Sequence, residues 1–153
     1  MSTVNERLAS LGLELPAVAT PAGAYVPAIV SGNLVFTAGQ LPSTAGVLPA
    51  TGKVGAEVTP EDAKQYARVC VLNGLAAAQS VIGSLDKIVK VVKVVGFVSS
   101  DPSFTGQPGV INGASELLGE IFGDAGVHAR SAVGVAVLPL DAPVEIEFVF
   151  EIA

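Results

Sequence analysis

A long amphipathic segment in the middle of the chain places the strongest constraint on the fold. Thr59-Pro60-Glu61-Asp62 is typical of a helix start, because threonine can cap, proline suits the first turn and acidic side chains lie at the positive end of the helix dipole. Apolar residues then follow the i, i+3, i+4 rule as far as Ile82, and Gly83 comes next. The pattern therefore predicts an amphipathic helix that ends at Gly83.

Segments rich in β-branched residues lie on both sides of this helix and predict strands. The run at 87–98 predicts a long strand in the centre of a sheet. Ser31-Gly32-Asn33 supplies residues that tolerate positive φ, as a tight hairpin between two short strands requires. The predicted strands are residues 24–30, 33–38, 87–98, 130–137 and 143–152. The other predicted helices are residues 4–12 and 109–122, and residues 41–58 are expected to form a loop.

This order of elements predicts an α+β fold with a mixed β-sheet and two helices packed on one face. The other face of the sheet would be apolar and uncovered. Only 14% of the residues are charged, where soluble domains have about 25%. Because interface cores are depleted in charge, we expect an obligate homo-oligomer. The 153 residues are expected to form a single domain, with residues 1–20 as an N-terminal helix and connector.

The composition argues against several classes of protein. The longest nearly apolar stretch, Val69 to Ile82, is interrupted by polar residues and is shorter than the ~18 residues of a membrane span. The N-terminus has no apolar run of the signal-peptide type, so we expect a cytoplasmic protein. With one cysteine, Cys70, and one histidine, His128, a zinc or iron site would need carboxylates for most of its ligands, and nothing suggests that arrangement. A net charge of −6 makes nucleic acid a poor partner.

The most informative motif lies in the last quarter of the chain. It reads Arg-Ser-Ala-Val-Gly-Val from Arg130, then Leu-Pro, then Val-Glu-Ile-Glu, with Glu145 fifteen positions after Arg130. Further upstream, residues 33–42 read Asn-Leu-Val-Phe-Thr-Ala-Gly-Gln-Leu-Pro, Tyr25 follows Pro-Ala-Gly-Ala, and Asn112 precedes the core of the second helix. Together, in colinear order over about residues 20–150, these segments resemble the Rid (reactive intermediate deaminase, YjgF-type) family.

The resemblance implies a homotrimer of chorismate-mutase-like subunits, with the sheets facing inward and a site in each cleft between neighbours. It implies hydrolysis of 2-imino or 2-enamino acids, which are small substrates that bear a carboxylate, to 2-keto acids and ammonia. Arg130 would bind the carboxylate through two parallel hydrogen bonds, and Glu145 would activate the attacking water. Gly39 would bring its backbone close to the ligand, while Tyr25 and Asn112 would line the cleft. No cofactor is required, because a protonated imine is already electrophilic.

The same residues also have plainer interpretations. Arg130 could be a surface cation paired with Glu120 or Asp124. Glu145 and Glu147 alternate onto one face of a strand, so either could be merely exposed. Cys70 is expected to pack in the core.

The chain departs from the family pattern in its longer loop at 41–58, in an extra N-terminal helix within residues 1–15, and at two places near the expected site. Ala132 stands where members often carry cysteine, and Tyr25 lies in Gly-Ala-Tyr-Val-Pro where the family has Gly-Pro-Tyr-Ser-Gln. These departures leave open a non-catalytic trimer that binds a small carboxylate metabolite. A third interpretation is the endoribonuclease role with which some relatives are labelled, against which the net charge of −6 counts.

Overall fold

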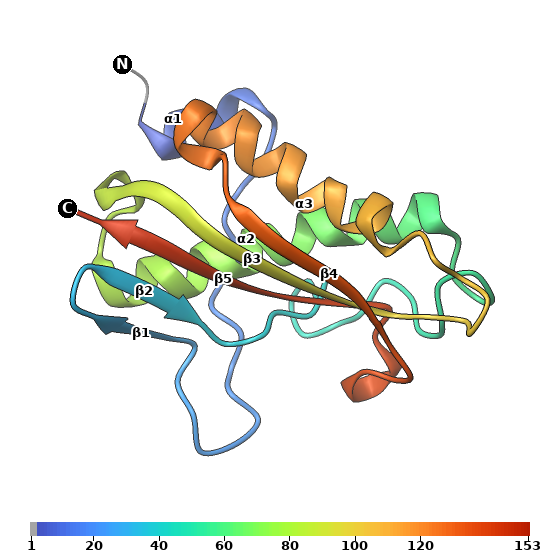
Figure 1. Ribbon diagram of the computed structural model, residues 1–153. Helices are drawn as coiled ribbons and strands as arrows, with labels where there is room; N and C mark the ends of the chain where they lie inside the picture. The colour runs from blue at the N-terminus through green and yellow to red at the C-terminus, as the bar shows by residue number, and fades with distance from the viewer. Residues whose placement is uncertain (1–2) are drawn as a thin grey trace.

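The computed structural model describes residues 3–153, so the first two residues of the predicted N-terminal extension lie outside it. Every helix and strand predicted from the sequence occurs, with ends that differ by a few residues (Figure 1). The helices are α1 (Val4–Ser10), α2 (Pro60–Ile82) and α3 (Gln107–Phe122). The strands are β1 (Ala28–Ser31), β2 (Leu34–Thr37), β3 (Ile88–Ser99), β4 (Ala129–Val135) and β5 (Val144–Ile152).

The five strands form one mixed sheet in the order β1-β2-β5-β3-β4. Strands β3 and β4 run parallel, and the other neighbours are antiparallel. The long strand predicted at residues 87–98 lies inside the sheet as expected, since β3 is paired with β4 on one side and β5 on the other. The β1–β2 hairpin adds to the far edge of β5, so β5 is the middle strand of the five.

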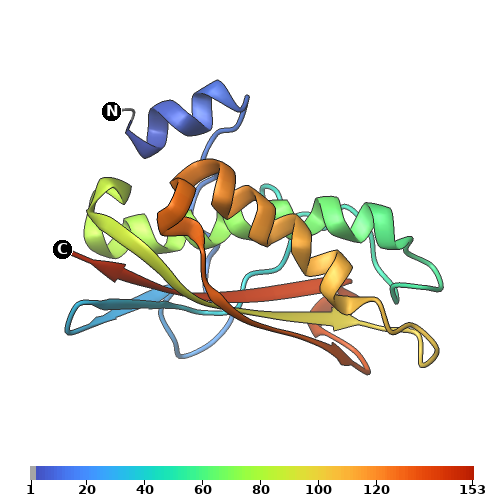
Figure 2. The same cartoon turned by 45° about the horizontal axis from the view of Figure 1, so that its top comes forward.

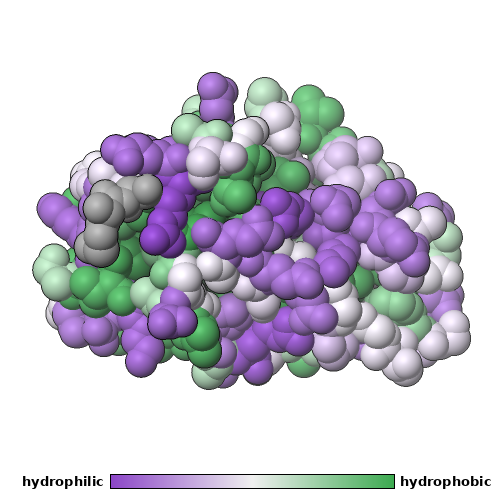
Figure 3. All heavy atoms as spheres, turned by 90° about the horizontal axis from the view of Figure 1, so that it is seen from above, coloured by the Kyte–Doolittle hydropathy of each residue, from purple (hydrophilic) through white to green (hydrophobic). Residues whose placement is uncertain are grey.

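Helices α2 and α3 cover one face of the sheet, and no helix covers the other face in the described chain (Figure 2). The predicted α+β architecture is therefore confirmed. Seen from the helical side, the surface is mostly hydrophilic, with smaller hydrophobic patches between (Figure 3). Among residues 3–153, none of the helices has both the length and the apolar character that would let it span a bilayer.

The predicted start, end and turn signals act as expected. The Thr59 hydroxyl accepts a hydrogen bond from the Asp62 N–H at 3.1 Å, and Gly83 ends α2 at a φ of 85°. Gly32 adopts a φ of 62° in the β1–β2 hairpin, and this positive φ causes little strain because glycine has no Cβ. Local chemistry therefore accounts for the boundaries of these elements.

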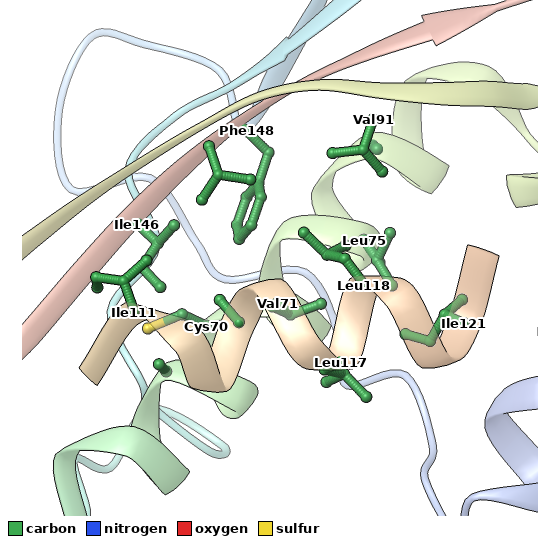
Figure 4. Close-up of a cluster of buried hydrophobic side chains, with 14 of the residues drawn as sticks. Cys70, Val71, Leu75, Val91, Ile111, Leu117, Leu118, Ile121, Ile146 and Phe148 are labelled. Atoms are coloured by element: carbon green, nitrogen blue, oxygen red, sulfur yellow. The ribbon is translucent and has the colours of Figure 1, made fainter. Parts of the chain in front are cut away.

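The core lies between α2, α3 and the sheet (Figure 4). The rings of Phe148 and Phe150 stack with centroids 5.8 Å apart beneath α2. Cys70 is fully buried in this core, which confirms the packing role predicted for it. Burial raises the pKa of its thiol, and the nearby charge of Glu145 raises that pKa further, so the side chain is not a reactive thiolate.

Three glycines allow these layers to approach closely. A Cβ at Gly113 of α3 would overlap the backbone carbonyl oxygen of Lys64 in α2. One at Gly74 would lie 2.5 Å from the ring of Phe148, and one at Gly96 would overlap Ile111. The missing side chains thus set how near α3 lies to α2 and to the sheet.

We predict that Gly113→Ala lowers the free energy of unfolding by about 1–3 kcal/mol, the usual cost of overpacking, because the backbone of Lys64 cannot move aside easily. Gly119 of α3 is the matched control, since a Cβ there meets nothing within 4 Å. Gly119→Ala should therefore stabilise the protein by about 0.5–1 kcal/mol through helix propensity. Urea unfolding measures both, and equal effects would contradict the close-approach explanation.

Candidate active site

Arg130, in the edge strand β4, points toward the helical layer and is held there by α3. Its Nη1 donates a hydrogen bond to Asn112 Oδ1 at 2.7 Å and another to Ser115 Oγ at 3.2 Å. Asn112 and Ser115 lie three residues apart, so they project from one side of α3. The structure therefore brings together two of the predicted site residues, Arg130 and Asn112.

The Arg130 guanidinium has no acidic partner within residues 3–153. Glu120 and Asp124 were the partners expected from the sequence if Arg130 were only a surface cation. Glu120 Oε1 lies 3.5 Å from Arg68 Nη1 instead, and Asp124 makes no ion pair in the described part of the chain. Both hydrogen bonds use Nη1, and Nε and Nη2 donate to no acceptor within residues 3–153. A planar pair of donors without a counter-ion is suited to a carboxylate ligand.

Two further residues extend this group and were not identified from the sequence. Ser115 Oγ lies 2.9 Å from His128 Nε2, and His128 Nδ1 lies 2.6 Å from the Gly126 carbonyl oxygen. A carbonyl only accepts, so Nδ1 carries the hydrogen, and in the neutral ring Nε2 accepts from the Ser115 hydroxyl. We call Arg130, Asn112, Ser115 and His128 the Arg130 group.

Sequence spacing contains the signal that would have found them. His128 is two residues before Arg130, and alternation along an extended chain puts both on one face. Ser115 is one helical turn beyond Asn112. Which faces meet is a matter of tertiary packing.

A second pair of predicted residues, the Glu145 group, consists of Glu145 in β5 and Gly39 after β2. A Cβ at Gly39 would lie only 2.5 Å from Glu145 Oε2, so no larger residue fits without displacing the carboxylate. The Glu145 side chain is partly buried, and the loss of hydration raises its pKa, with the charge of Glu147 adding to the rise. A carboxylate with a raised pKa is a stronger base toward water.

Strand register separates the two groups within one chain. Glu145 alternates with the fully buried Val144 and Ile146, so it lies on the face opposite the helices, whereas Arg130 contacts α3. The two residues also sit at different positions along the sheet: on β3, Arg130 is paired with Val94, whereas Glu145 is paired with Phe97. The two side chains therefore start roughly 10 Å apart along the strands and roughly 10 Å apart across them, on opposite faces of the sheet.

Tyr25 lies on the connector before β1. Its side chain is half exposed, and its hydroxyl oxygen accepts a hydrogen bond from the Ala22 N–H at 3.2 Å. In the described part of the chain it has no hydrogen bond to any other predicted site residue. Nor do three or more His, Cys, Asp or Glu side chains among residues 3–153 gather as metal ligands would.

We predict that Glu145→Gln stabilises the protein most at high pH. The folded-state pKa of Glu145 is raised, so folding favours the protonated acid, and the wild type loses stability as the pH rises through that pKa. Glutamine removes the charge at every pH. The stability gained by Glu145→Gln, measured by thermal unfolding between about pH 4 and 8, should grow with pH from the ordinary carboxyl range upward. A gain that is constant with pH would contradict the assigned environment.

Comparison with known proteins places the chain in a family. The sequence profile described as "YjgF/chorismate_mutase-like, putative endoribonuclease" matches residues 5–152. Protein TCP17 of Trypanosoma cruzi is 43% identical over 150 residues, which is 97% of this chain and 94% of that protein. The Agrobacterium tumefaciens protein Atu1372, of unknown function, is 43% identical with a TM-score of 0.91, covering 99% of this chain and 94% of its own.

Escherichia coli TdcF, solved with bound serine, is a more distant relative. It is 26% identical with a TM-score of 0.64, over 91% of this chain and 94% of its own. Since the family profile covers nearly the whole sequence, the chain belongs to the YjgF/chorismate-mutase-like family.

Proposed function

We propose that the protein hydrolyses 2-imino or 2-enamino acids to 2-keto acids and ammonia, in clefts between the subunits of a homotrimer. The observation that carries this proposal is the Arg130 guanidinium, which is held by two neutral acceptors and has no acidic partner in the described chain. Its free edge matches the carboxylate that every such substrate bears.

Glu145 is the base in this proposal. Its raised pKa suits it to accept a proton from water. The Gly39 N–H beside it donates to no acceptor within residues 3–153, although the N–H groups of Ala38 and Gln40 are both satisfied. That free N–H can donate to an oxygen atom close to the carboxylate, which would help to hold the water or the forming hydroxyl.

The reaction then needs only placement and proton transfer. Water attacks C2 of the protonated imine while Glu145 accepts its proton, and the C=N π electrons move to nitrogen. Glu145 returns that proton to the carbinolamine nitrogen. The C–N bond then breaks with its electrons going to nitrogen, while the hydroxyl gives its proton to Glu145 and the keto group forms. Ammonia takes this last proton, so the protonated imine and water balance the keto acid and ammonium, and no redox partner takes part.

Assembly supplies what a single chain lacks. Because Arg130 and Glu145 lie on opposite faces of one sheet, a common site requires the Arg130 group of one subunit and the Glu145 group of another. Ile29 and Phe36 are exposed on the helix-free face, as is Val133, at 58%, 40% and 44%. Exposed apolar side chains on an uncovered sheet face favour association through that face, as the proposed inward-facing sheets require.

The relatives bear on the choice of reaction. Serine, the molecule bound in TdcF, is a small carboxylate with a nitrogen at C2, and it supports a site for amino-acid-like ligands. The endoribonuclease named in the family description is less well supported here. The net charge of −6 disfavours binding to a phosphate backbone, and a single histidine cannot form the pair of histidines that acid–base cleavage of RNA often uses.

We predict that Arg130→Ala lowers kcat/KM for freshly generated imines by at least about 100-fold, since it removes two hydrogen bonds to a charged group that contribute about 1.5–3 kcal/mol each. Arg130→Lys should recover little, because lysine lacks the paired donors. Arg68→Ala, which removes an arginine already paired with Glu120, is the matched control and should retain activity. Ammonia release is the readout. Wild-type rates in Arg130→Ala would rule out the proposed role.

We also predict that two inactive variants restore each other. In mixed trimers of Arg130→Ala and Glu145→Gln, some clefts combine an intact arginine from one subunit with an intact glutamate from its neighbour. Random mixing gives about one quarter of clefts with both groups, so about a quarter of wild-type activity should return after co-refolding. Light scattering verifies the trimer. Absence of recovery in mixed trimers would mean that the two residues do not share an inter-subunit cleft.

A further inference from the structure

A hollow between α3 and the start of β4 adjoins the Arg130 guanidinium. It has a volume of about 340 Å³ and is lined by Ser115, Gly119, Gly126, Val127, His128 and Arg130. Because Arg130 is one of its walls, a molecule whose carboxylate binds the guanidinium lies at the mouth of this hollow. The catalytic steps described above make no use of it.

We propose that this hollow receives the side chain of the substrate and that Ser115 and His128 make it selective for side chains ending in a neutral hydrogen-bonding group. The inference rests on the proposed function and deepens it, by assigning the substrate class. Arg130 takes the α-carboxylate, and the remainder of the molecule extends along α3.

The hydrogen-bond pattern determines what the hollow accepts. The Ser115 hydroxyl donates to His128 Nε2, and its oxygen accepts from Arg130 Nη1 at 3.2 Å. One lone pair of Ser115 Oγ remains, so this oxygen can accept a hydrogen bond from a ligand. The His128 ring is held by the Gly126 carbonyl and cannot turn without losing that bond.

Charge and polarity then rank the candidate side chains. An amide can donate to the free lone pair of Ser115 Oγ. An apolar side chain of the same shape would cover that oxygen without replacing the hydrogen bonds it makes to water. A second carboxylate would find no second formal cation in the wall, since Arg130 already neutralises the α-carboxylate. The substrate class is therefore a 2-imino acid with a short amide- or hydroxyl-bearing side chain.

The two glycines of the wall differ in a way that provides a clean test. Gly126 cannot carry a side chain, because a Cβ there would overlap the Leu118 carbonyl oxygen. Gly119 can, since a Cβ on it meets nothing within 4 Å. Gly119→Leu therefore fills the hollow without strain in the backbone. Gly109→Leu is the matched control, because Gly109 is an equally open position of α3 that does not line the hollow.

The experiment compares imines derived from asparagine, leucine and aspartate, which are near-isosteric, with the smaller imine derived from alanine. We expect wild-type kcat/KM to favour the asparagine-derived imine over the leucine- and aspartate-derived ones by about tenfold, the equivalent of one hydrogen bond. Ser115→Ala should remove that preference. A purely structural role for Ser115 would lower all rates equally and leave the ratio unchanged.

Gly119→Leu should raise KM for the asparagine-derived imine by at least about tenfold while changing turnover of the alanine-derived imine little, since a methyl group does not reach the hollow. Gly109→Leu should behave as wild type with both. Equal effects of the two leucine variants, or a wild type that does not discriminate among the isosteres, would overturn the inference while the deaminase proposal stands.

Failure of the proposed function has a different signature. In that case no imine, including the one derived from alanine, is hydrolysed faster than in buffer. Thermal shift with the corresponding keto acids then decides on the hollow. Binding of the amide-bearing keto acid that Gly119→Leu abolishes and Gly109→Leu preserves supports the pocket, and equal binding by both variants overturns it.

Discussion

Helix α3 lies close to both α2 and the sheet because Gly113 and Gly96 present no side chains at those contacts. This approach brings Asn112 and Ser115 within hydrogen-bond distance of Arg130 in β4. Without it the guanidinium would extend from an edge strand with no neighbour to orient it. Close packing at these glycines in the core therefore fixes the orientation of the Arg130 side chain at the surface.

The two charged residues of the site are poorly accommodated by the single chain. Arg130 has no counter-ion within residues 3–153, and Glu145 is partly buried beside the like charge of Glu147, which raises its pKa. Groups held in this way contribute little to folding and become useful when a ligand or a neighbouring subunit supplies what is missing. The exposed apolar side chains of Ile29 and Phe36 likewise lack a covering layer in the single chain.

Much of the fold follows from local pattern. The helix signals from Thr59 to Gly83, the hairpin at Gly32 and the β-branched run of β3 each depend on neighbouring residues and predict the observed elements. The order of strands was less accessible, and β5 rather than β3 lies in the middle. Strand order depends on which edges pair over long sequence separations, and alternation within a strand does not contain that information.

At the candidate site, the amino-acid sequence specifies the residue types and the face of each element on which they lie. Spacing places Arg130 with His128, and Asn112 with Ser115, on common faces, while alternation puts Glu145 away from the core. Which faces meet depends on tertiary packing. It brings the four residues of the Arg130 group together across α3 and β4, and it places Glu145 against Gly39. The two groups lie on opposite faces of the sheet. The physical reason is that periodicity orients a side chain relative to its own element, whereas proximity between elements arises from core packing, which here depends on the glycines between the layers.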